Sequence, residues 1–318
     1  MLPEISIIIP AYNAEAYLEV CIASVKAQTL TTFEAIIVND ASTDSTPELA
    51  RRITEGDDRF RVIDLPQNRG LSGARNAGTA EASGEYVTYL DSDDALYPQA
   101  LEAMLGLLRE HGAEVCCAAF SRSGEFTPRS YGRFRCREFD YEGAMKATLY
   151  RHLRLNSAWA KLYRKERIVS AGGFREGIWY EDLDSFYRIM EGAGKILYIE
   201  EPLYFYRDHA GSFVNRWSEG RLDVLDVTDR MAEFFAERYP ELHGAALDRR
   251  FSAHFNILML LLKNGVRNPE AEARCMAVIK EGRSRALRDR AVKLKNKIGA
   301  VVSLLGRPAL GILSRIFY

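Results

Sequence analysis

The sequence predicts an α/β fold: a mostly parallel sheet flanked by helices and followed by a helical C-terminal appendage. Two observations lead to this fold class. In the first hundred residues, short apolar runs alternate with amphipathic stretches of helical period, which is the pattern of βαβ units. From about residue 220 onward, long stretches of helical period replace the short runs.

The alternating region gives seven elements before residue 91. Apolar runs predict the strands, and the amphipathic stretches between them predict the helices. The first strand is expected to stop at Pro10. The expected strands are residues 5–9, 34–38, 61–65 and 86–90, and the expected helices are about residues 14–28, 45–53 and 71–82.

Beyond residue 110 the pattern is less regular, with short strands around one loop-rich stretch at 121–137. The change to a helical pattern places a domain boundary near residues 216–220. The strands expected in this part are 115–120, 194–199 and 203–206, and the helices are 222–239, 246–263 and 269–281.

Composition and charge narrow the class of protein. Hydrophobic residues make up 47% and charged residues 27% of the 318 residues, which is ordinary for a globular chain. The net charge of −1 indicates no nucleic-acid partner. The five cysteines are odd in number and form no C-x-x-C pair, which favours buried thiols in a reducing cytosol over disulfides or zinc.

No targeting segment is expected. The N-terminus has no basic region followed by an apolar run, so we expect no signal peptide. No window contains 18 uninterrupted apolar residues, so we expect no membrane-spanning helix. These observations predict a location on the cytoplasmic side.

Polar residues follow three of the expected strands. Asn13 lies beyond the first strand, Asp40 beyond the second and Asp91-Ser-Asp-Asp94 beyond the fourth. Right-handed crossovers bring the carboxyl ends of parallel strands to one edge of the sheet, where open α/β sheets bind ligands. We therefore expect these side chains to face one crevice.

The segment Asp91–Asp94 predicts a metal site. In an extended segment residues i and i+2 point the same way, so Asp91 and Asp93 can converge on one ligand. Paired carboxylates at a strand end suit Mg²⁺ or Mn²⁺, which would also bind diphosphate oxygens. The alternative is structural, because Asp94 can cap a helix that follows.

Five motifs follow one another over roughly the first 210 residues. They are Ser6-Ile-Ile-Ile-Pro-Ala-Tyr-Asn13, Val38-Asn-Asp-Ala-Ser-Thr-Asp44, Asn68-Arg-Gly-Leu-Ser-Gly-Ala-Arg-Asn-Ala-Gly78, Asp91-Ser-Asp-Asp94 and Tyr180-Glu-Asp182. In order and spacing they resemble family 2 glycosyltransferases of the GT-A fold. The resemblance implies the Rossmann-like sheet of a nucleotide-diphospho-sugar transferase.

The resemblance assigns most of the strand-end residues to the nucleotide. Asp40 matches the carboxylate that recognises the base, where it can accept the N3–H of uracil. Asp91 would contact the ribose side, and Asp93 would ligate the metal. The residues implied in nucleotide binding are Pro10, Tyr12, Asn13, Asp40, Arg75, Asp91, Ser92 and Arg207.

The second motif departs from the family's usual D-D-G-S. Asn39 stands in place of the first Asp, and Ala41 stands in place of the Gly. The carboxylate that reads the base, Asp40, is retained. The departure therefore bears on uridine specificity more than on nucleotide binding.

Glu181-Asp182 opens an amphipathic stretch of helical period. An acidic residue at a helix start is often only a cap or a partner of the helix dipole. The resemblance implies instead that Asp182 is the general base, which deprotonates the attacking hydroxyl in one in-line, inverting displacement. Glu181 is the alternative base or a partner of the acceptor.

Two further positions are implied downstream. Arg207 and His209 match residues that reach the diphosphate or the metal, and ordinary loop residues are the alternative. Trp217 follows Arg216 as in the Q-x-x-R-W element of processive synthases, but Phe213 occupies the Gln position. We therefore expect addition of a single sugar.

The resulting domain division has a catalytic domain at 1–216, with a nucleotide-binding half at 1–110 and an acceptor half at 111–216, then a helical region at 217–282 and a tail at 283–318. The tail has nine Lys and Arg residues and one acid, Asp289, and it runs into apolar turns. A basic helix of this kind predicts peripheral attachment to anionic lipid on the inner face of the plasma membrane. The alternative is a final helix packed on the body.

Together these inferences predict an inverting, Mn²⁺- or Mg²⁺-dependent glycosyltransferase. It would move one sugar from a nucleotide-sugar donor, expected to be a UDP-sugar, to a hydroxyl of a glycan or polyprenyl-linked acceptor in surface-polysaccharide synthesis. A nucleotidyltransferase would need a Gly-rich loop with a Lys after the first strand, where this chain has Pro10-Ala-Tyr-Asn-Ala-Glu15. The other alternative, a catalytically silent binding module, is disfavoured by the retained Asp93, Asp182 and His209. A dinucleotide oxidoreductase is excluded because no G-x-G-x-x-G follows the first strand.

Overall fold

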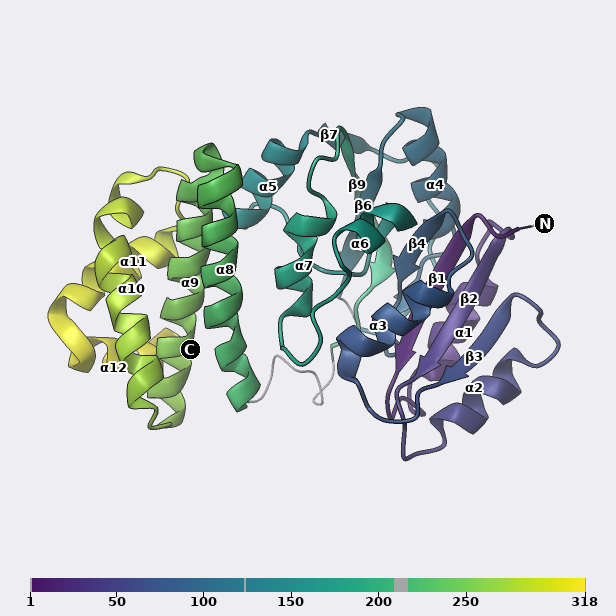
Figure 1. The fold of residues 1–318 in the computed structure, drawn as a ribbon, viewed down its shortest axis with the longest axis horizontal. Coiled ribbons are helices and arrows are strands. Elements are labelled where there is room, and N and C mark those ends of the chain that lie inside the picture. The colour runs from purple at the N-terminus through teal and green to yellow at the C-terminus, as the bar shows by residue number, and fades with distance from the viewer. Residues whose placement is uncertain (1, 123, 209–216, 318) are drawn as a thin grey trace. The chain divides into compact units, whose positions relative to one another are not determined.

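The computed structural model describes residues 2–122, 124–208 and 217–317. The chain divides into two compact units, the first made of residues 1–144, 155–177 and 181–210 and the second of residues 145–154, 178–180 and 211–318. The first unit is a sheet covered by helices and the second is helical (Figure 1). The expected fold class is confirmed.

The first unit is built on a nine-stranded sheet. Its strands are β1 (Ile5–Ala11), β2 (Phe33–Asn39), β3 (Phe60–Asp64), β4 (Tyr86–Tyr89), β5 (Ala95–Leu96), β6 (Val115–Ser121), β7 (Cys136–Phe139), β8 (Lys161–Arg164) and β9 (Ile196–Phe205). The order is β3-β2-β1-β4-β8-β6-β9-β5, and β7 also pairs with β9.

Six of these strands run in one direction. β1 to β4 pair in parallel, as do β6 and β9, whereas β8 is antiparallel to both β4 and β6. The carboxyl ends of β1, β2, β4, β6 and β9 therefore lie at one edge of the sheet, together with the beginning of β8. We call this edge the carboxyl edge.

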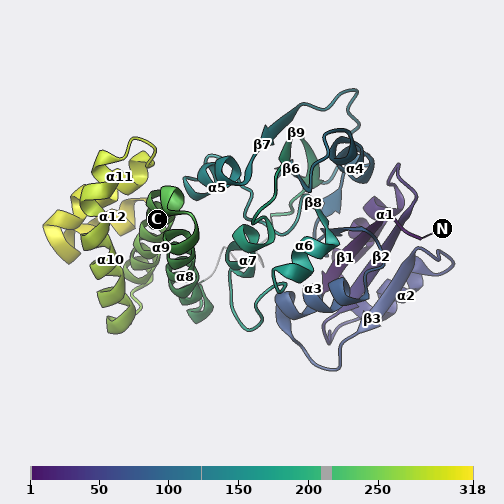
Figure 2. The ribbon, with the colours of Figure 1, turned by 45° about the horizontal axis from the view of Figure 1, so that its top comes forward.

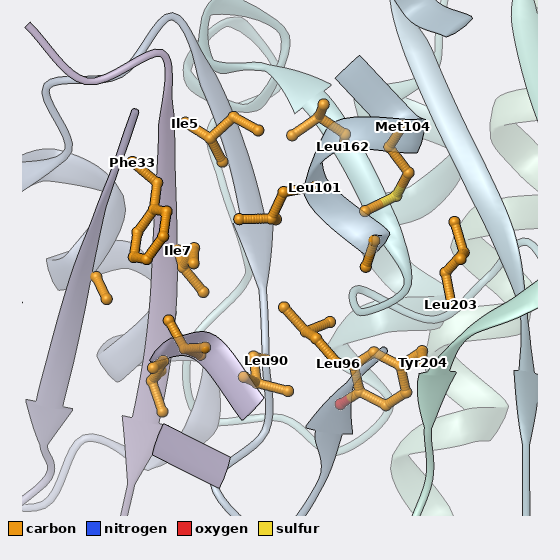
Figure 3. Close-up of a cluster of buried hydrophobic side chains, with 14 of the residues drawn as sticks. Ile5, Ile7, Phe33, Leu90, Leu96, Leu101, Met104, Leu162, Leu203 and Tyr204 are labelled. Atoms are coloured by element: carbon orange, nitrogen blue, oxygen red, sulfur yellow. The ribbon is translucent and has the colours of Figure 1, made fainter. Parts of the chain in front are cut away.

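Helices cover both faces of the sheet (Figures 1 and 2). One face buries Ile5, Ile7 and Ile9 of β1 in a cluster that includes Leu101 and Met104 (Figure 3). The burial of both faces explains why β1 and β2 are mostly apolar and do not alternate between apolar and polar residues. The helices of this unit are α1 (Leu18–Lys26), α2 (Thr46–Thr54), α3 (Gly70–Glu81), α4 (Ala100–Glu110), α5 (Tyr141–Leu149), which extends into the second unit, α6 (Lys165–Ser170) and α7 (Glu181–Ile189).

Helix α3 approaches the sheet closely at Gly78. A Cβ atom at this position would lie 2.4 Å from Cγ2 of Ile8 and 3.1 Å from Cγ2 of Val38, so only glycine permits the approach. Arg75 lies one turn earlier on the same face of the helix. The close packing at Gly78 therefore carries Arg75 to the carboxyl edge of the sheet.

Three expected boundaries in the first unit were wrong. Strand β1 continues through Pro10 to Ala11, because its pairing with β4 ends at Ile8 and the missing N–H of Pro10 faces that side. Helix α1 begins only at Leu18, because residues 14–17 form a tighter turn. The two strands expected at 194–199 and 203–206 are the single strand β9, whose pairing with β6 shifts register near Pro202.

The second unit packs its helices around α9, in which 13 residues are buried, including Phe251 and Phe255. Its helices are α8 (Asp223–Arg238), α9 (Pro240–Asn264), α10 (Pro269–Arg288), α11 (Leu294–Val302) and α12 (Gly306–Phe317). The basic part of the tail, expected as one helix, is divided: its first part ends α10, and α11 begins after a break.

Helices α11 and α12 are partly packed on the second unit and partly exposed. The buried Asn296 amide donates to Oδ1 of Asp248 at 2.8 Å, and Gly299 lies against the ring of Phe255. By length and composition alone, residues 294–315 would be long and apolar enough to cross a membrane, with a mean hydropathy of 1.3 and 28% of that window buried. The chain does not continue as one straight helix there, because Gly306 has φ +79°.

Candidate active site

A pocket of about 440 Å³ opens at the carboxyl edge of the sheet, beyond β1, β2 and β4. The sequence-predicted strand-end residues meet there, as the crossover rule requires. Tyr12 is exposed, with 51% of its surface accessible. The predicted residues that line the pocket are Pro10, Tyr12, Asn13, Asp40, Asp91, Ser92 and Asp93.

The turn after β2 presents Asp40 to this pocket. Oδ1 of the buried Asp40 accepts the N–H of Arg69 at 2.7 Å, and the Asn68 amide donates to the Asp40 carbonyl at 3.0 Å. Asn39, which replaces the family's usual Asp, donates to Oδ1 of Asp64 at 2.8 Å. The asparagine therefore ties β2 to β3, and Asp40 remains the carboxylate of this turn that faces the pocket.

Ala41 occupies a backbone conformation that favours glycine, with φ +56°. We expect Ala41→Gly to raise the free energy of unfolding by about 1 kcal/mol, because the left-handed region costs an L residue roughly 1–2 kcal/mol and the extra freedom of glycine offsets part of that gain. Ala80→Gly on the exposed side of α3 is the matched control and should lower it by about 1 kcal/mol. Urea denaturation measures both; destabilisation by Ala41→Gly would contradict the expectation.

The turn after β4 is held by buried hydrogen bonds. The hydroxyl of Tyr204 donates to Oδ2 of Asp94 at 2.6 Å, and the Arg207 N–H donates to Oδ1 of Asp94 at 2.8 Å. Burial, followed by the charges of Asp91 and Asp93, raises the pKa of Asp94 to about 8. Asp94 thus fixes the turn after β4 through these hydrogen bonds. It does not cap α4, whose N-cap is Gln99.

Arg207 also holds this turn. Its Nε donates to the Asp93 carbonyl at 2.8 Å, and its guanidinium lies 5.4 Å from the ring centroid of Tyr17, a residue of the pocket wall. The structure therefore brings Arg207 beside the pocket, although it is not among the lining residues. His209 and Arg216 lie outside the described residues.

Arg75 is buried beneath the pocket and does not line it. Its two terminal nitrogens donate to Oδ1 of Asp91 at 2.8 Å and to Oε1 of Glu181 at 2.6 Å. The guanidinium also lies 5.4 Å from the ring centroid of Phe174. Arg75 thus joins the turn after β4 to the start of α7, a role that sequence analysis did not anticipate.

This bridge brings Asp182 to the same edge. Oδ1 of Asp182 accepts the N–H of Leu183 at 2.6 Å, so the carboxylate sits on the first turn of α7. Burial, followed by the charge of Glu181, raises the pKa of Asp182 to about 7, while Arg75 acts in the opposite direction. A carboxylate with a raised pKa is a stronger base, which suits proton removal near neutral pH.

Three carboxylates line the pocket, those of Asp40, Asp91 and Asp93. Asp91 accepts from Arg75, and Asp94 accepts from Tyr204 and Arg207. Within the described ranges, no group of three or more His, Cys, Asp or Glu side chains could hold a metal. These residues fit a cation shared between Asp93 and a bound diphosphate, because Mg²⁺ in nucleotide sites is often held by one or two carboxylates plus phosphates.

Sequence analysis missed two buried polar residues that shape this edge. Tyr204 joins Asp94 to the backbone of Asp91, whose N–H donates to the tyrosine hydroxyl at 3.2 Å. Lys161 opens β8 and is buried. Each stands in an apolar segment that is typical of a core strand, so no local sequence signal marks its role.

Comparison with known proteins gives the family. Residues 6–168 match the family described as Glycosyl transferase family 2. The chain is 31% identical over 269 residues to EpsH of Bacillus subtilis (strain 168), covering 81% of this chain and 77% of EpsH. It is 30% identical over 253 residues to the glycosyltransferase GlyG of Streptococcus pneumoniae serotype 4 (strain ATCC BAA-334 / TIGR4), covering 77% of this chain and 82% of GlyG. The chain therefore belongs to glycosyltransferase family 2.

Solved structures show the same fold. The S. aureus TarS 1-349 structure in complex with UDP-GlcNAc matches with a TM-score of 0.70 and 20% identity, covering 98% of this chain and 88% of that one. The mannosyltransferase PcManGT from Pyrobaculum calidifontis, in complex with GDP-Man and Mn²⁺, matches with a TM-score of 0.54 and 16% identity, covering 100% of this chain and 88% of that one. The sheet of the first unit is thus that of a GT-A glycosyltransferase.

Proposed function

We propose that this family 2 glycosyltransferase is an inverting, metal-dependent enzyme of polysaccharide synthesis. It transfers one sugar from a UDP-sugar to a hydroxyl of a glycan or polyprenyl-linked acceptor. The observation that carries the proposal is the bridge through Arg75, which joins Asp91 of the pocket to Glu181 at the start of α7. The bridge supports Asp182 as the candidate base, because it links the residue before Asp182 to a residue of the pocket.

Two similarities support the choice of donor. Asp40 lies in the pocket wall, where its carboxylate can accept the N3–H of uracil. The TarS structure that shares this fold contains UDP-GlcNAc. UDP-GlcNAc is therefore the first donor to test.

The proposed reaction is a single displacement. Asp182 takes the proton of the acceptor hydroxyl as its oxygen bonds to the anomeric carbon, and the bond to the diphosphate breaks with its electron pair leaving on UDP. Attack opposite the leaving group inverts the anomeric centre. Arg75 keeps Asp182 in place through Glu181, and Asp93 would hold the cation with the diphosphate. When bound, a Mn²⁺ or Mg²⁺ ion supplies positive charge that stabilises the departing diphosphate.

A thermal-shift screen of UDP, GDP, dTDP, CMP and NAD, each with Mn²⁺ and with EDTA, tests this proposal. We expect UDP with Mn²⁺ to raise the Tm most, since a ligand at 100 times its Kd stabilises the fold by about 2.7 kcal/mol. Asp93→Ala should abolish the Mn²⁺-dependent part of the shift. Asp58→Ala, an exposed acid beyond the opposite edge of the sheet, is the matched control and should not change it.

Other outcomes of the screen are equally informative. A larger shift with GDP or dTDP would contradict the assignment of uracil recognition to Asp40. No shift with any nucleotide would favour a catalytically silent module over an enzyme.

We also propose that the second unit attaches the enzyme to a membrane. Much of the exposed apolar surface lies on the last two helices and the turn between them, while their small and polar residues pack inward. Lys295 and Arg315 are exposed on the same segment and suit anionic lipid headgroups. The exposed apolar residues are Leu294, Ile298, Val301, Leu304, Leu305 and Ile312.

Vesicle co-sedimentation tests the attachment. The triple variant Leu294→Gln, Ile298→Gln and Leu305→Gln should bind vesicles of phosphatidylcholine and phosphatidylglycerol at least about tenfold more weakly, because it removes apolar side chains that would enter the interface. The matched control changes Leu2, Val20 and Val169, which are exposed on the first unit, to Gln and should bind normally. Equal binding by both variants would disprove the attachment. Substitution is preferable to truncation, because Arg283 and Asn296 hold the tail to its unit.

A further inference from the structure

Three half-buried aromatic residues gather at the carboxyl edge outside the nucleotide pocket. Phe120 lies near the end of β6, and Tyr206 follows the end of β9. Trp159 precedes β8, which runs in the opposite direction, so it lies at the same edge. Phe120, Trp159 and Tyr206 are called the aromatic platform below.

The rings of the platform are in mutual contact. The centroid of Trp159 lies 4.8 Å from that of Phe120 at an interplanar angle of 81°, and 5.6 Å from that of Tyr206 at 35°. The guanidinium of the exposed Arg122 lies 4.6 Å from the centroid of Tyr206. The result is a joined aromatic surface with a cationic rim.

One side chain, that of Tyr204, connects the aromatic platform to the turn after β4. Trp159 stacks on the buried Tyr204, with centroids 4.7 Å apart and planes 16° apart. The hydroxyl of Tyr204 donates to Asp94 at 2.6 Å. In the strand order, β4 lies between β1 and β2 on one side and β8, β6 and β9, which carry the platform, on the other; the turn after β4 also lines the nucleotide pocket.

The backbone next to Trp159 adopts a strained conformation that neighbouring hydrogen bonds hold in place. The next residue, Ala160, has φ +55°, a conformation that an L residue adopts only when its surroundings enforce it. The ammonium of buried Lys161 donates to the carbonyls of Ser157 and Trp159 at 2.6 and 3.2 Å, and to the Ser157 hydroxyl at 2.8 Å. Burial lowers the pKa of Lys161 to about 8, because the charged form is disfavoured in a buried position. A strained alanine and a buried lysine together fix the position of one tryptophan.

We propose that the aromatic platform is the acceptor subsite and receives the apolar C–H face of the acceptor sugar ring. This inference rests on the proposed transferase function and deepens it by naming the acceptor side. Aromatic side chains bind such a face with little loss of conformational freedom, because each has only two side-chain torsions. An acceptor bound there reaches the donor sugar from across the turn after β4, on the side away from the nucleotide pocket, which in-line displacement requires.

Saturation-transfer NMR tests the subsite with a named set of probes: the methyl β-glycosides of glucose, galactose and N-acetylglucosamine. Each is added to the full-length protein in the presence of UDP and Mg²⁺. We expect at least one glycoside to bind the wild-type protein, and Trp159→Ala to weaken that binding about tenfold or more. Trp159→Phe, which keeps an aromatic ring, should restore most of it.

Two controls separate this proposal from loss of the fold and from failure of the proposed function. Tyr198→Ala removes another half-buried aromatic ring from the middle of β9, between Cys117 and Arg137 in the sheet, and should leave glycoside binding unchanged. The UDP-dependent thermal shift should persist in Trp159→Ala within about threefold in affinity, because Trp159 does not line the nucleotide pocket.

Three outcomes would overturn the inference. Glycoside binding that is equal in Trp159→Ala and the wild type would disprove the subsite. Binding of UDP without any glycoside by the wild type would also disprove it, while leaving the donor site intact. A wild type that binds no nucleotide would instead disprove the proposed function, and the subsite with it.

Discussion

Asp182→Asn should reduce the turnover number for sugar transfer by about 10²- to 10⁴-fold, the range that general-base catalysis contributes. The amide keeps the shape of the side chain but cannot accept the proton of the attacking hydroxyl. Asp182 does not line the nucleotide pocket, so the affinity for UDP with Mn²⁺ should change little. Initial rates with UDP-GlcNAc and the UDP-dependent thermal shift measure the two quantities separately.

The pH dependence of sugar transfer by the wild-type enzyme should reflect the ionisation of Asp182. Burial and the charge of Glu181 raise the pKa of Asp182 to about 7. Since the base must be ionised, transfer should fall as the pH drops below about 7, and this acidic limb should be absent from the residual activity of Asp182→Asn.

Stability should change in the opposite sense to activity. The pKa of Asp182 is higher in the folded state than in the unfolded chain, so between these pKa values the folded state binds more protons and stability decreases as pH rises. The ionised carboxylate is therefore a cost to folding above pH 7. Asp182→Asn should remove that cost and raise the Tm at pH 8.

Glu181→Gln is the matched comparison. Oε1 of Glu181 accepts from Arg75 at 2.6 Å, so this carboxylate is engaged in positioning and is poorly suited to exchange protons with a substrate. Its variant should retain the acidic limb of the pH profile. A variant pair in which Glu181→Gln loses the limb and Asp182→Asn keeps it would assign the base to Glu181.

The sequence predicted the parallel half of the sheet and the contents of its carboxyl edge. The residues of β1 and β2 are mostly apolar because these two strands are buried, and the crossover rule then places Asp40 and Asp91 together without any further information. The local period of the chain and one topological rule were sufficient for this part.

The other half of the site depends on contacts between distant positions. Arg75 and Glu181 are separated by 106 residues, and no local pattern indicates that they meet. The strand β9 contains Glu200-Glu201-Pro202, which is typical of a turn, yet β9 pairs with β6 on both sides of this segment. The contact between Arg75 and Glu181 and the continuity of β9 are set by tertiary contacts, which override local preference. They could therefore not be predicted from a single sequence.

Arg75→Met should lower the free energy of unfolding by about 3–5 kcal/mol, the cost of removing one partner from a buried ion pair. Only 2% of the Arg75 side chain is exposed, against 21% for Asp91 and 13% for Glu181. Methionine fills a similar volume, so the loss comes from two carboxylates that would share a partly buried space without a cation. Urea denaturation followed by fluorescence measures the change.

The matched control is Arg69→Met, which removes an exposed ion pair with Glu176 just before α3. Both partners have side chains about 39% exposed, so the change in unfolding free energy should be about 1 kcal/mol or less. A comparable loss in the two variants would show that Arg75 contributes by packing alone.

The effect of pH distinguishes charge from packing in Arg75→Met. Without the guanidinium, two carboxylates repel each other in a partly buried space, and protonation of either one relieves that repulsion. The deficit of the variant relative to the wild type should therefore shrink as the pH falls toward 5. Adding Glu181→Gln to Arg75→Met should recover part of the loss at pH 8, since one unpaired charge is removed. A deficit that is independent of pH and unchanged in the double variant would refute the bridge, and with it the reason for placing Asp182 beside the donor.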